Sequence, residues 1–277
     1  MNSPYTIKTL MDGLNFPEAP LIDQRGRIWC TELFAGAITC LDANAVRRLS
    51  VGTTANGMIE DAQGDFYITD SAENVVRWAN AETGEAKPLF DKTNEGETIH
   101  RPNDLCFDKL GNLLVTCHAE ARTTPDGYVV VQTLAGEVKK VSTKKYFPNG
   151  IALDALGTTL YFSETYKHRV WKATWNPNAC VIEHEVPWVD VGGPIGPDGM
   201  CLDCQGNVYV TVFDQSKIEV ISPEGTIIET IRLPYARPTS CAFDTSGQHG
   251  LLVTDADQGL LFSVNHAAEG LPPFRRS

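Results

Sequence analysis

The stretch FPNGIALDALGTTLYFSET, residues 147–165, contains the pattern on which the fold of the whole chain depends. An apolar run follows Asn149, a D-x-x-G sequence interrupts it, and a second run rich in β-branched and aromatic residues follows. Aspartate bonds local backbone in turns and glycine adopts a positive φ there, so the stretch predicts an antiparallel hairpin with a tight turn. Asparagine is a poor strand residue, and its place directly ahead of the first strand therefore needs an explanation.

The same hairpin pattern occurs six times along the chain. Each copy has aspartate five residues and glycine eight residues after its first position, and a hydroxyl residue ends its second apolar run. The first positions are Glu18, Asn56, Asn103, Asn149, Asp198 and Thr239. The hydroxyl residues are Thr31, Thr69, Thr116, Ser163, Thr211 and Thr254. Successive copies lie 38 to 49 residues apart, which leaves room for further strands between the hairpins.

These repeats predict an all-β fold, a six-bladed β-propeller with four antiparallel strands per blade. Residues 1–277 are expected to form a single propeller domain, in which YTIKTL at residues 5–10 can supply a strand to the last blade. A solenoid of β-hairpins is the structural alternative. It is disfavoured because the sequence shows no polar capping repeat of the kind that solenoids need.

The composition narrows the classes of partner. The formal net charge is −12 and the pI is about 4.9, which argues against nucleic acid, because nucleic-acid binding depends on lysine and arginine. No apolar stretch approaches the roughly 20 residues of a membrane span, and the first residues lack the basic and apolar regions of a signal peptide. The protein is therefore expected to be cytoplasmic, without membrane contact.

The chain has eight cysteines, most of them within strand-like runs. Without an export signal, we expect buried reduced thiols rather than disulfides. Cys201 and Cys204 form an isolated C-x-x-C sequence with no second pair nearby, so a metal or redox role for it is disfavoured.

The first positions of the repeats are the candidate functional residues. In a propeller the innermost strand of each blade runs along the central channel, so these six residues should meet at one mouth of that channel. All six offer an oxygen atom, two are carboxylates, and proline, which stiffens the approach, precedes five of them. A plain preference for turns would account for Asn56 and Thr239, but it accounts poorly for Glu18.

Two carboxylates that face each other across a narrow channel need a proton or a cation between them. Ligand sets made only of oxygen favour hard divalent cations such as Ca²⁺, Mg²⁺ or Mn²⁺. The sequence therefore predicts a metal site at this mouth, with Asn149 among its ligands.

Four motifs, FPEAP (16–20), RPNDLCFD (101–108), FPNGIALD (147–154) and GPDGMCLD (196–203), together resemble the family of senescence marker protein 30, gluconolactonase and luciferin-regenerating enzyme. The resemblance covers nearly the whole chain and implies a lactone hydrolase with one divalent cation, Ca²⁺, Mg²⁺, Mn²⁺ or Zn²⁺. It implies that Glu18, Asn149 and Asp198 hold the cation. It also places Asn103 near the metal or the substrate and Arg101 on substrate oxygens. The segment TCHAEARTTPDG (116–127) departs from the family pattern, and Glu120 is its candidate substrate-contacting acid.

These observations favour a metal-dependent hydrolase of a small lactone. Asp198 is the candidate general base, because the GPDG sequence gives its loop freedom, and Glu18 is then a purely structural ligand. The loops after the return strands, which carry Phe34, Tyr166 and Phe213, should rim the pocket and suit a small oxygenated substrate with some apolar surface. His118 and His168 lie in the same loops and are candidate substrate contacts.

Two other functions stay open. An organophosphate (phosphotriester) hydrolase could use the same site, with Asn103 as a fourth ligand of the cation. A non-catalytic propeller, either a calcium-binding protein or an interaction scaffold, would explain a metal site without chemistry.

Overall fold

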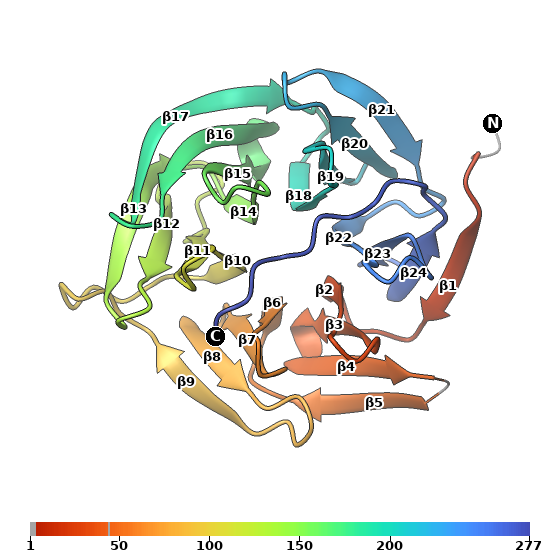
Figure 1. Ribbon diagram of the computed structural model, residues 1–277, viewed down its shortest axis with the longest axis horizontal. Coiled ribbons are helices and arrows are strands. Elements are labelled where there is room, and N and C mark those ends of the chain that lie inside the picture. Colours follow the sequence, from red (N-terminus) through yellow and green to blue (C-terminus); the bar gives the residue numbers. More distant parts are fainter. Residues whose placement is uncertain (1–3, 44) are drawn as a thin grey trace.

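The computed structural model describes residues 4–43 and 45–277, and these residues form a six-bladed β-propeller (Figure 1). Six four-stranded antiparallel sheets surround a central axis, which confirms the predicted fold class. The described residues contain two short 3₁₀-helices, η1 (Leu33–Ala35) and η2 (Thr165–Lys167). No helix in this part of the chain is long and apolar enough to cross a membrane.

Each of the first three blades is built from strands that are consecutive in the sequence, and the innermost strand comes first. Blade 1 contains β2 (Pro17–Ile22), β3 (Ile28–Glu32), β4 (Ala37–Asp42) and β5 (Ala45–Ser50). Blade 2 contains β6 (Ala55–Glu60), β7 (Phe66–Asp70), β8 (Val75–Ala79) and β9 (Ala86–Phe90). Blade 3 contains β10 (Pro102–Phe107), β11 (Leu113–Cys117), β12 (Gly127–Gln132) and β13 (Val138–Lys145).

The remaining blades follow the same order, and the last one closes the ring. Blade 4 contains β14 (Pro148–Leu153), β15 (Thr159–Glu164), β16 (Arg169–Asn176) and β17 (Val181–Asp190). Blade 5 contains β18 (Gly196–Leu202), β19 (Val208–Phe213), β20 (Lys217–Ile221) and β21 (Ile227–Arg232). Blade 6 contains β22 (Pro238–Phe243), β23 (Leu251–Asp255), β24 (Leu260–Val264) and, as its outer strand, β1 (Ile7–Met11). The strand predicted for blade 6 from YTIKTL is therefore confirmed.

The six D-x-x-G sequences form the turns between the two innermost strands of each blade. The φ angles of their glycines lie between +64° and +87°, a region that only glycine enters readily. The aspartates accept backbone hydrogen bonds within the turn, as when Asp108 Oδ1 accepts from Leu110 N at 2.8 Å and Asn112 N at 2.9 Å. Each inner strand starts one or two residues before its first position and runs toward its turn, so the turns lie at the end of the axis away from the first positions.

The core is divided into clusters that lie between neighbouring blades. The cluster that contains Trp29, Ile38, Phe66 and Ile68 joins blades 1 and 2, for example, and each of the other five blade interfaces has its own cluster. All eight cysteines lie among the described residues and are free thiols, of which six are buried. Cys204 is exposed, and Cys201 Sγ lies 3.6 Å from Cys241 Sγ rather than beside Cys204.

The hydroxyl residue that ends the second run of each repeat connects one blade to the next. Five of them donate to the backbone carbonyl of the first-position residue in the following blade: Thr31 to Asn56, Thr69 to Asn103, Thr116 to Asn149, Ser163 to Asp198 and Thr211 to Thr239. The distances from Thr116 Oγ1 to Asn149 O and from Ser163 Oγ to Asp198 O are 2.7 and 2.8 Å. These bonds fix the height of each first-position residue relative to its neighbours.

We expect Thr116→Val to be less stable than both the natural protein and Thr116→Ser. The threonine hydroxyl also accepts from Asp104 N at 3.0 Å, so valine leaves two buried backbone groups unsatisfied. The loss should be roughly 2 kcal/mol or more of unfolding free energy. Serine keeps the hydroxyl and is the matched control. Urea unfolding of the three proteins measures the effect, and a valine variant as stable as the serine variant would contradict it.

Candidate metal centre

The first-position residues of the propeller come together at one end of the central channel. Residues from four blades, Glu18, Asn56, Asn103 and Asn149, line a cavity of about 10 Å³ there. A cavity of this size holds roughly one water molecule or one small ion. The structure therefore brings these predicted residues together on the axis, although they are widely separated in the sequence.

Thr239, the first residue of blade 6, does not line this cavity. Its side chain is fully buried, and its hydroxyl donates to the carbonyl of Pro17 at 2.7 Å. The hydroxyl therefore bonds to the backbone of blade 1 and closes the ring, and it also hydrogen-bonds the carboxylate of Glu18, whose pKa it lowers. Blade 6 contributes the neighbouring residue, Ser240, to the lining of the cavity.

The amide of Asn149 has a fixed orientation. Thr165 Oγ1 donates its hydrogen to the carbonyl of Pro197 at 2.8 Å, so it can only accept from Asn149 Nδ2, which lies 3.4 Å away. The amide nitrogen therefore faces the hydroxyl, and the amide oxygen faces the other way. Asn56 repeats this arrangement with Ser71, whose hydroxyl donates to Pro102 O.

The glycine that follows Asn149 allows neighbouring inner strands to approach closely. A Cβ atom on Gly150 would lie 2.6 Å from the carbonyl oxygen of Asp198 and 2.8 Å from the Cα of Gly199. Any side chain at Gly150 would push β18 away from β14. The N-G and D-G sequences at the starts of the inner strands thus keep the ring narrow.

The carboxylates near the axis are buried and repel one another. Burial, followed by the charges of Asp198 and Asp104, raises the pKa of Glu18 well above its usual range. Burial and the charge of Asp104 raise the pKa of Asp198 to about 8. Burial raises the pKa of Asp104 to about 6, although the backbone N–H groups of Leu105 and Ile151 donate to its carboxylate at 2.8 and 3.0 Å. Each of these shifts shows that negative charge here lacks compensation.

Asp104 is a residue of this site that the sequence analysis missed. It follows Asn103 directly and lines the same small cavity. A signal was present in the sequence, because Asp104 is the only ionisable side chain among the second positions of the six repeats. Those positions are occupied by Ala19, Gly57, Asp104, Gly150, Gly199 and Ser240.

The donor set fits a hard divalent cation. In the described residues no three histidine, cysteine, aspartate or glutamate side chains form a group that could hold a metal, so a cation here would depend on asparagine amides as well as carboxylates. Carboxylate and amide oxygens are the ligands that Ca²⁺ and Mg²⁺ prefer. Because burial and mutual repulsion raise the pKa values of Glu18 and Asp198, a cation bound between them would compete with protons.

Arg101 and Glu120 lie at the rim above this cavity. Arg101 is held at φ +52°, and its guanidinium lies 2.9 Å from the carboxylate of Glu120. Both side chains are about half exposed, at 42% and 56%, so water and solutes can reach the pair. The two residues predicted to contact substrate are thus neighbours that bind each other.

Aromatic side chains form two groups at the same rim. Phe147 stacks on His118, with ring centroids 4.0 Å apart, and contacts Tyr166 at 5.4 Å. In the second group Phe16 packs against Phe34 at 5.0 Å and lies 6.5 Å from Phe213. His168 lies at the end of η2, where its backbone N–H bonds to Thr165 O.

His118 should make the stability of the protein depend on pH. Burial, followed by the charges of Arg101 and Arg122, lowers its pKa to about 3, whereas an unfolded histidine titrates near 6.5. Between pH 3 and pH 6.5 the folded state therefore binds fewer protons at His118 than the unfolded state does. The free energy of unfolding is highest above pH 6.5 and decreases as the pH falls toward 3. At pH 5 the loss amounts to about 2 kcal/mol.

When the pH falls from 8 to 5, the unfolding free energy of the natural protein should decrease by about 2 kcal/mol more than that of His118→Asn, because asparagine does not take up a proton. Urea unfolding at both pH values measures the difference. His184→Asn, at an exposed position, is the matched control. Equal pH dependence in the natural protein and His118→Asn would contradict the assignment.

Comparisons with known proteins agree with this architecture. Diisopropyl-fluorophosphatase of Loligo vulgaris is 30% identical over 176 residues, an alignment that spans 58% of this chain and 56% of the squid protein. Lactonase drp35 of Staphylococcus aureus is 25% identical over 291 residues, 96% of this chain and 86% of that protein. The calcium-binding protein regucalcin of Agrobacterium tumefaciens has the same fold, with a TM-score of 0.87, 17% identity and coverage of 99% and 98% of the two chains.

The sequence profile described as the SMP-30/Gluconolactonase/LRE-like region matches residues 16–257, most of the chain. The match begins two residues before Glu18 and ends in blade 6, so it includes every first position of the six repeats. The chain therefore belongs to the SMP-30/gluconolactonase/LRE-like family, which includes lactonases and other hydrolases.

Proposed function

We propose that this protein hydrolyses small lactones with the help of one divalent cation held by Glu18, Asn149 and Asp198. The observation that carries the proposal is the convergence of two carboxylates, Glu18 and Asp104, and three asparagines on a cavity of single-ion size. Asp198 is buried next to this lining, and its charge raises the pKa of Glu18. The lactonase of Staphylococcus aureus among the relatives supports the choice of reaction. Regucalcin, described as a calcium-binding protein, supports the choice of a divalent ion such as Ca²⁺.

A divalent cation bound there would polarise the carbonyl group of a lactone and lower the pKa of nearby water. Asp198 takes the proton from the attacking water, since one of its carboxylate oxygens can bind the cation while the other accepts the proton. Glu18 supplies charge and does not move a proton. Asn103, which lines the same cavity, orients the substrate through its amide.

The rim residues bind the rest of the substrate. Arg101 binds substrate oxygens in place of the Glu120 carboxylate. The Arg101–Glu120 ion pair lies at the surface and contributes about 1 kcal/mol or less to stability, so a substrate can replace it. The stacked rings of Phe147 and His118 and the packed rings of Phe16 and Phe34 supply apolar contact on two sides of the substrate. This rim favours a lactone that has an apolar face as well as oxygen atoms.

Phosphotriester hydrolysis is the second candidate. The squid diisopropyl-fluorophosphatase is a relative, and the same aromatic rim would accept the alkyl groups of a phosphotriester. In that reaction the phosphoryl oxygen would replace the lactone carbonyl, and Asn103 would serve as a fourth ligand of the cation.

Metal binding is the first test. We expect one Ca²⁺ or Mn²⁺ per chain by mass spectrometry after dialysis, and a large loss of affinity in Glu18→Gln and in Asp198→Asn because each removes one charge from the ligand set. Asp214→Asn is the matched control, since Asp214 pairs with Arg237 at 2.7 Å on the rim outside the site. Unchanged metal content in both Glu18→Gln and Asp198→Asn would contradict the assignment.

Lactonase kinetics separate the two carboxylates. At saturating metal, Asp198→Asn should lower kcat by about 10²–10⁴-fold, the scale expected when a general base is lost. Glu18→Gln should regain most of its activity as the metal concentration rises, because Glu18 only holds the ion. If both variants recover fully, Asp198 is a ligand alone and the base must be another residue.

The substrate class is tested with a lactone panel and a phosphotriester panel under the same conditions. We expect higher kcat/KM on lactones, and higher values on lactones with an apolar substituent than on polyhydroxylated ones. Preference for phosphotriesters would favour the second candidate. Activity on neither panel with any divalent cation would leave the non-catalytic propeller as the better interpretation.

A further inference from the structure

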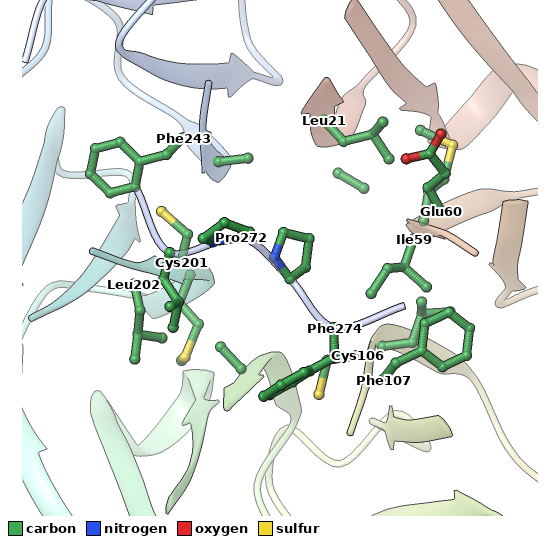
Figure 2. Close-up of a pocket in the computed structure, with 18 of the residues that line it drawn as sticks. Leu21, Ile59, Glu60, Cys106, Phe107, Cys201, Leu202, Phe243, Pro272 and Phe274 are labelled. Carbon is green, nitrogen blue, oxygen red and sulfur yellow. The ribbon is translucent and has the colours of Figure 1, made fainter. Parts of the chain in front are cut away.

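A second and larger cavity lies on the propeller axis at the end opposite the rim. It has a volume of about 180 Å³ and is lined by the inner strands of all six blades (Figure 2). Asp104 lines both this cavity and the small one at the candidate metal centre, so it marks the boundary between the two. We call the larger space the floor cavity, because it lies beside the D-x-x-G turns.

Residues 271–275 form the floor of this cavity. This segment crosses the axis from blade 5 to blade 2, as the dark blue trace in Figure 1 shows. Leu271 N donates to Leu202 O at 2.9 Å at one side, and Arg275 pairs with the buried carboxylate of Glu60 at 2.9 Å at the other. Between these anchors lie Pro272 and Pro273, which have no N–H group and are exposed. The structure thus has a strap that is held at its ends and not in its middle.

The walls of the floor cavity are mainly apolar and unusually rich in sulfur. Five sulfur-containing side chains line it: Met58, Cys106, Met200, Cys201 and Cys241. Phe107, Phe243 and Phe274 also line it, and Figure 2 shows Phe243 near one end of the strap and Phe274, which belongs to the strap, toward the other end. Thioether and thiol sulfur atoms make favourable contacts with the edges of aromatic rings.

Of the three charged side chains at the cavity, Glu60 and Arg275 compensate each other, and Asp104 lies at the boundary with the candidate metal centre. Glu60 is paired with Arg275, and Asp104 accepts hydrogen bonds from two backbone N–H groups. An anionic ligand would therefore lose its hydration without gaining a free cationic partner, and a cation would bind at Asp104 and the candidate metal centre rather than against the apolar walls. An apolar cavity of about 150 Å³ in another protein stays dry and binds benzene, so a cavity of 180 Å³ can hold one ring-sized molecule.

We propose that the floor cavity is a binding site for one small neutral aromatic molecule, about the size of benzene or indole. The site is separate from the candidate metal centre and does not depend on the proposed hydrolase activity. The ligand enters beside the unbonded middle of the strap, where the cavity-lining residues Thr245, Pro272 and Pro273 are exposed.

Methyl NMR of methionine provides a direct test. The chain has four methionines, of which Met58 and Met200 line the floor cavity, while Met11 is buried between blades 6 and 1 and serves as an internal control. Titration of the ¹³C-methyl-labelled protein with benzene or indole should shift the Met58 and Met200 signals in a saturable way, through ring currents, and leave Met11 unchanged. Cyclohexane, of similar size but without a π system, should bind more weakly.

Variants assign the binding to this cavity. Ala242→Phe places a ring in the space that the half-buried Ala242 lines, and should weaken binding of benzene by about tenfold or more. Phe274→Ala enlarges the cavity and should admit naphthalene, which keeps the proposal testable if Ala242→Phe does not fold. Asp198→Asn should bind benzene as the natural protein does, which separates this site from the metal centre.

Three results would overturn the proposal. The first is the absence of a saturable shift at Met58 and Met200 up to the solubility limit of the probes. The second is an equal shift of Met11, which would indicate non-specific partitioning into the core. The third is binding of cyclohexane as tight as that of benzene, which would contradict the aromatic preference.

Discussion

The hydrogen bond from a buried hydroxyl in one blade to the carbonyl of the next inner strand sets the geometry of this propeller. Blades contact each other mainly through apolar side chains, and apolar contacts alone would tolerate sliding of one sheet along its neighbour. A hydroxyl such as Thr116, bonded to Asn149 O at 2.7 Å, removes that freedom at the position where the inner strand starts. The residues that face the channel mouth are therefore held at one level.

Ring closure uses the same chemistry with a different donor. Between blades 6 and 1 the bond comes from Thr239, which donates to Pro17 O. One of the six first positions thus closes the ring, while four others, Glu18, Asn56, Asn103 and Asn149, line the small cavity. Pairing of β1 with β24 closes the outer part of the same blade.

The two ends of the axis have opposite chemistry. At the rim end, oxygen atoms surround a space of single-ion size, and in the described part of the chain no lysine or arginine lines it. The pKa values of Glu18, Asp104 and Asp198 are raised because their charges lack a fixed partner, which suits an exchangeable cation better than a structural ion pair. At the other end, sulfur and aromatic side chains surround a space in which Glu60 is paired with Arg275.

Much of this structure could be predicted from the sequence. The spacing of aspartate and glycine in the repeats predicted six hairpins, because the tight turn needs a side chain that bonds the backbone and a residue with positive φ. The propeller then followed from the number of repeats, and it predicted that Glu18, Asn56, Asn103 and Asn149 would meet. These local rules are strong, since each depends on residues only a few positions apart.

The remaining features depend on contacts between segments far apart in the chain. Thr239 could not be told from the other first positions, because its hydroxyl bonds to blade 1, more than 200 residues away in sequence. The pKa of Asp104 is raised by burial, and its charge in turn raises the pKa values of Glu18 and Asp198, which lie on other blades. The strap of residues 271–275 has no repeat pattern, and its place on the axis is set by contacts with blades 2 and 5. The sequence by itself determined the hairpins and their number, whereas only the tertiary structure decided which side chains share the axis, because burial and charge there are properties of the closed ring.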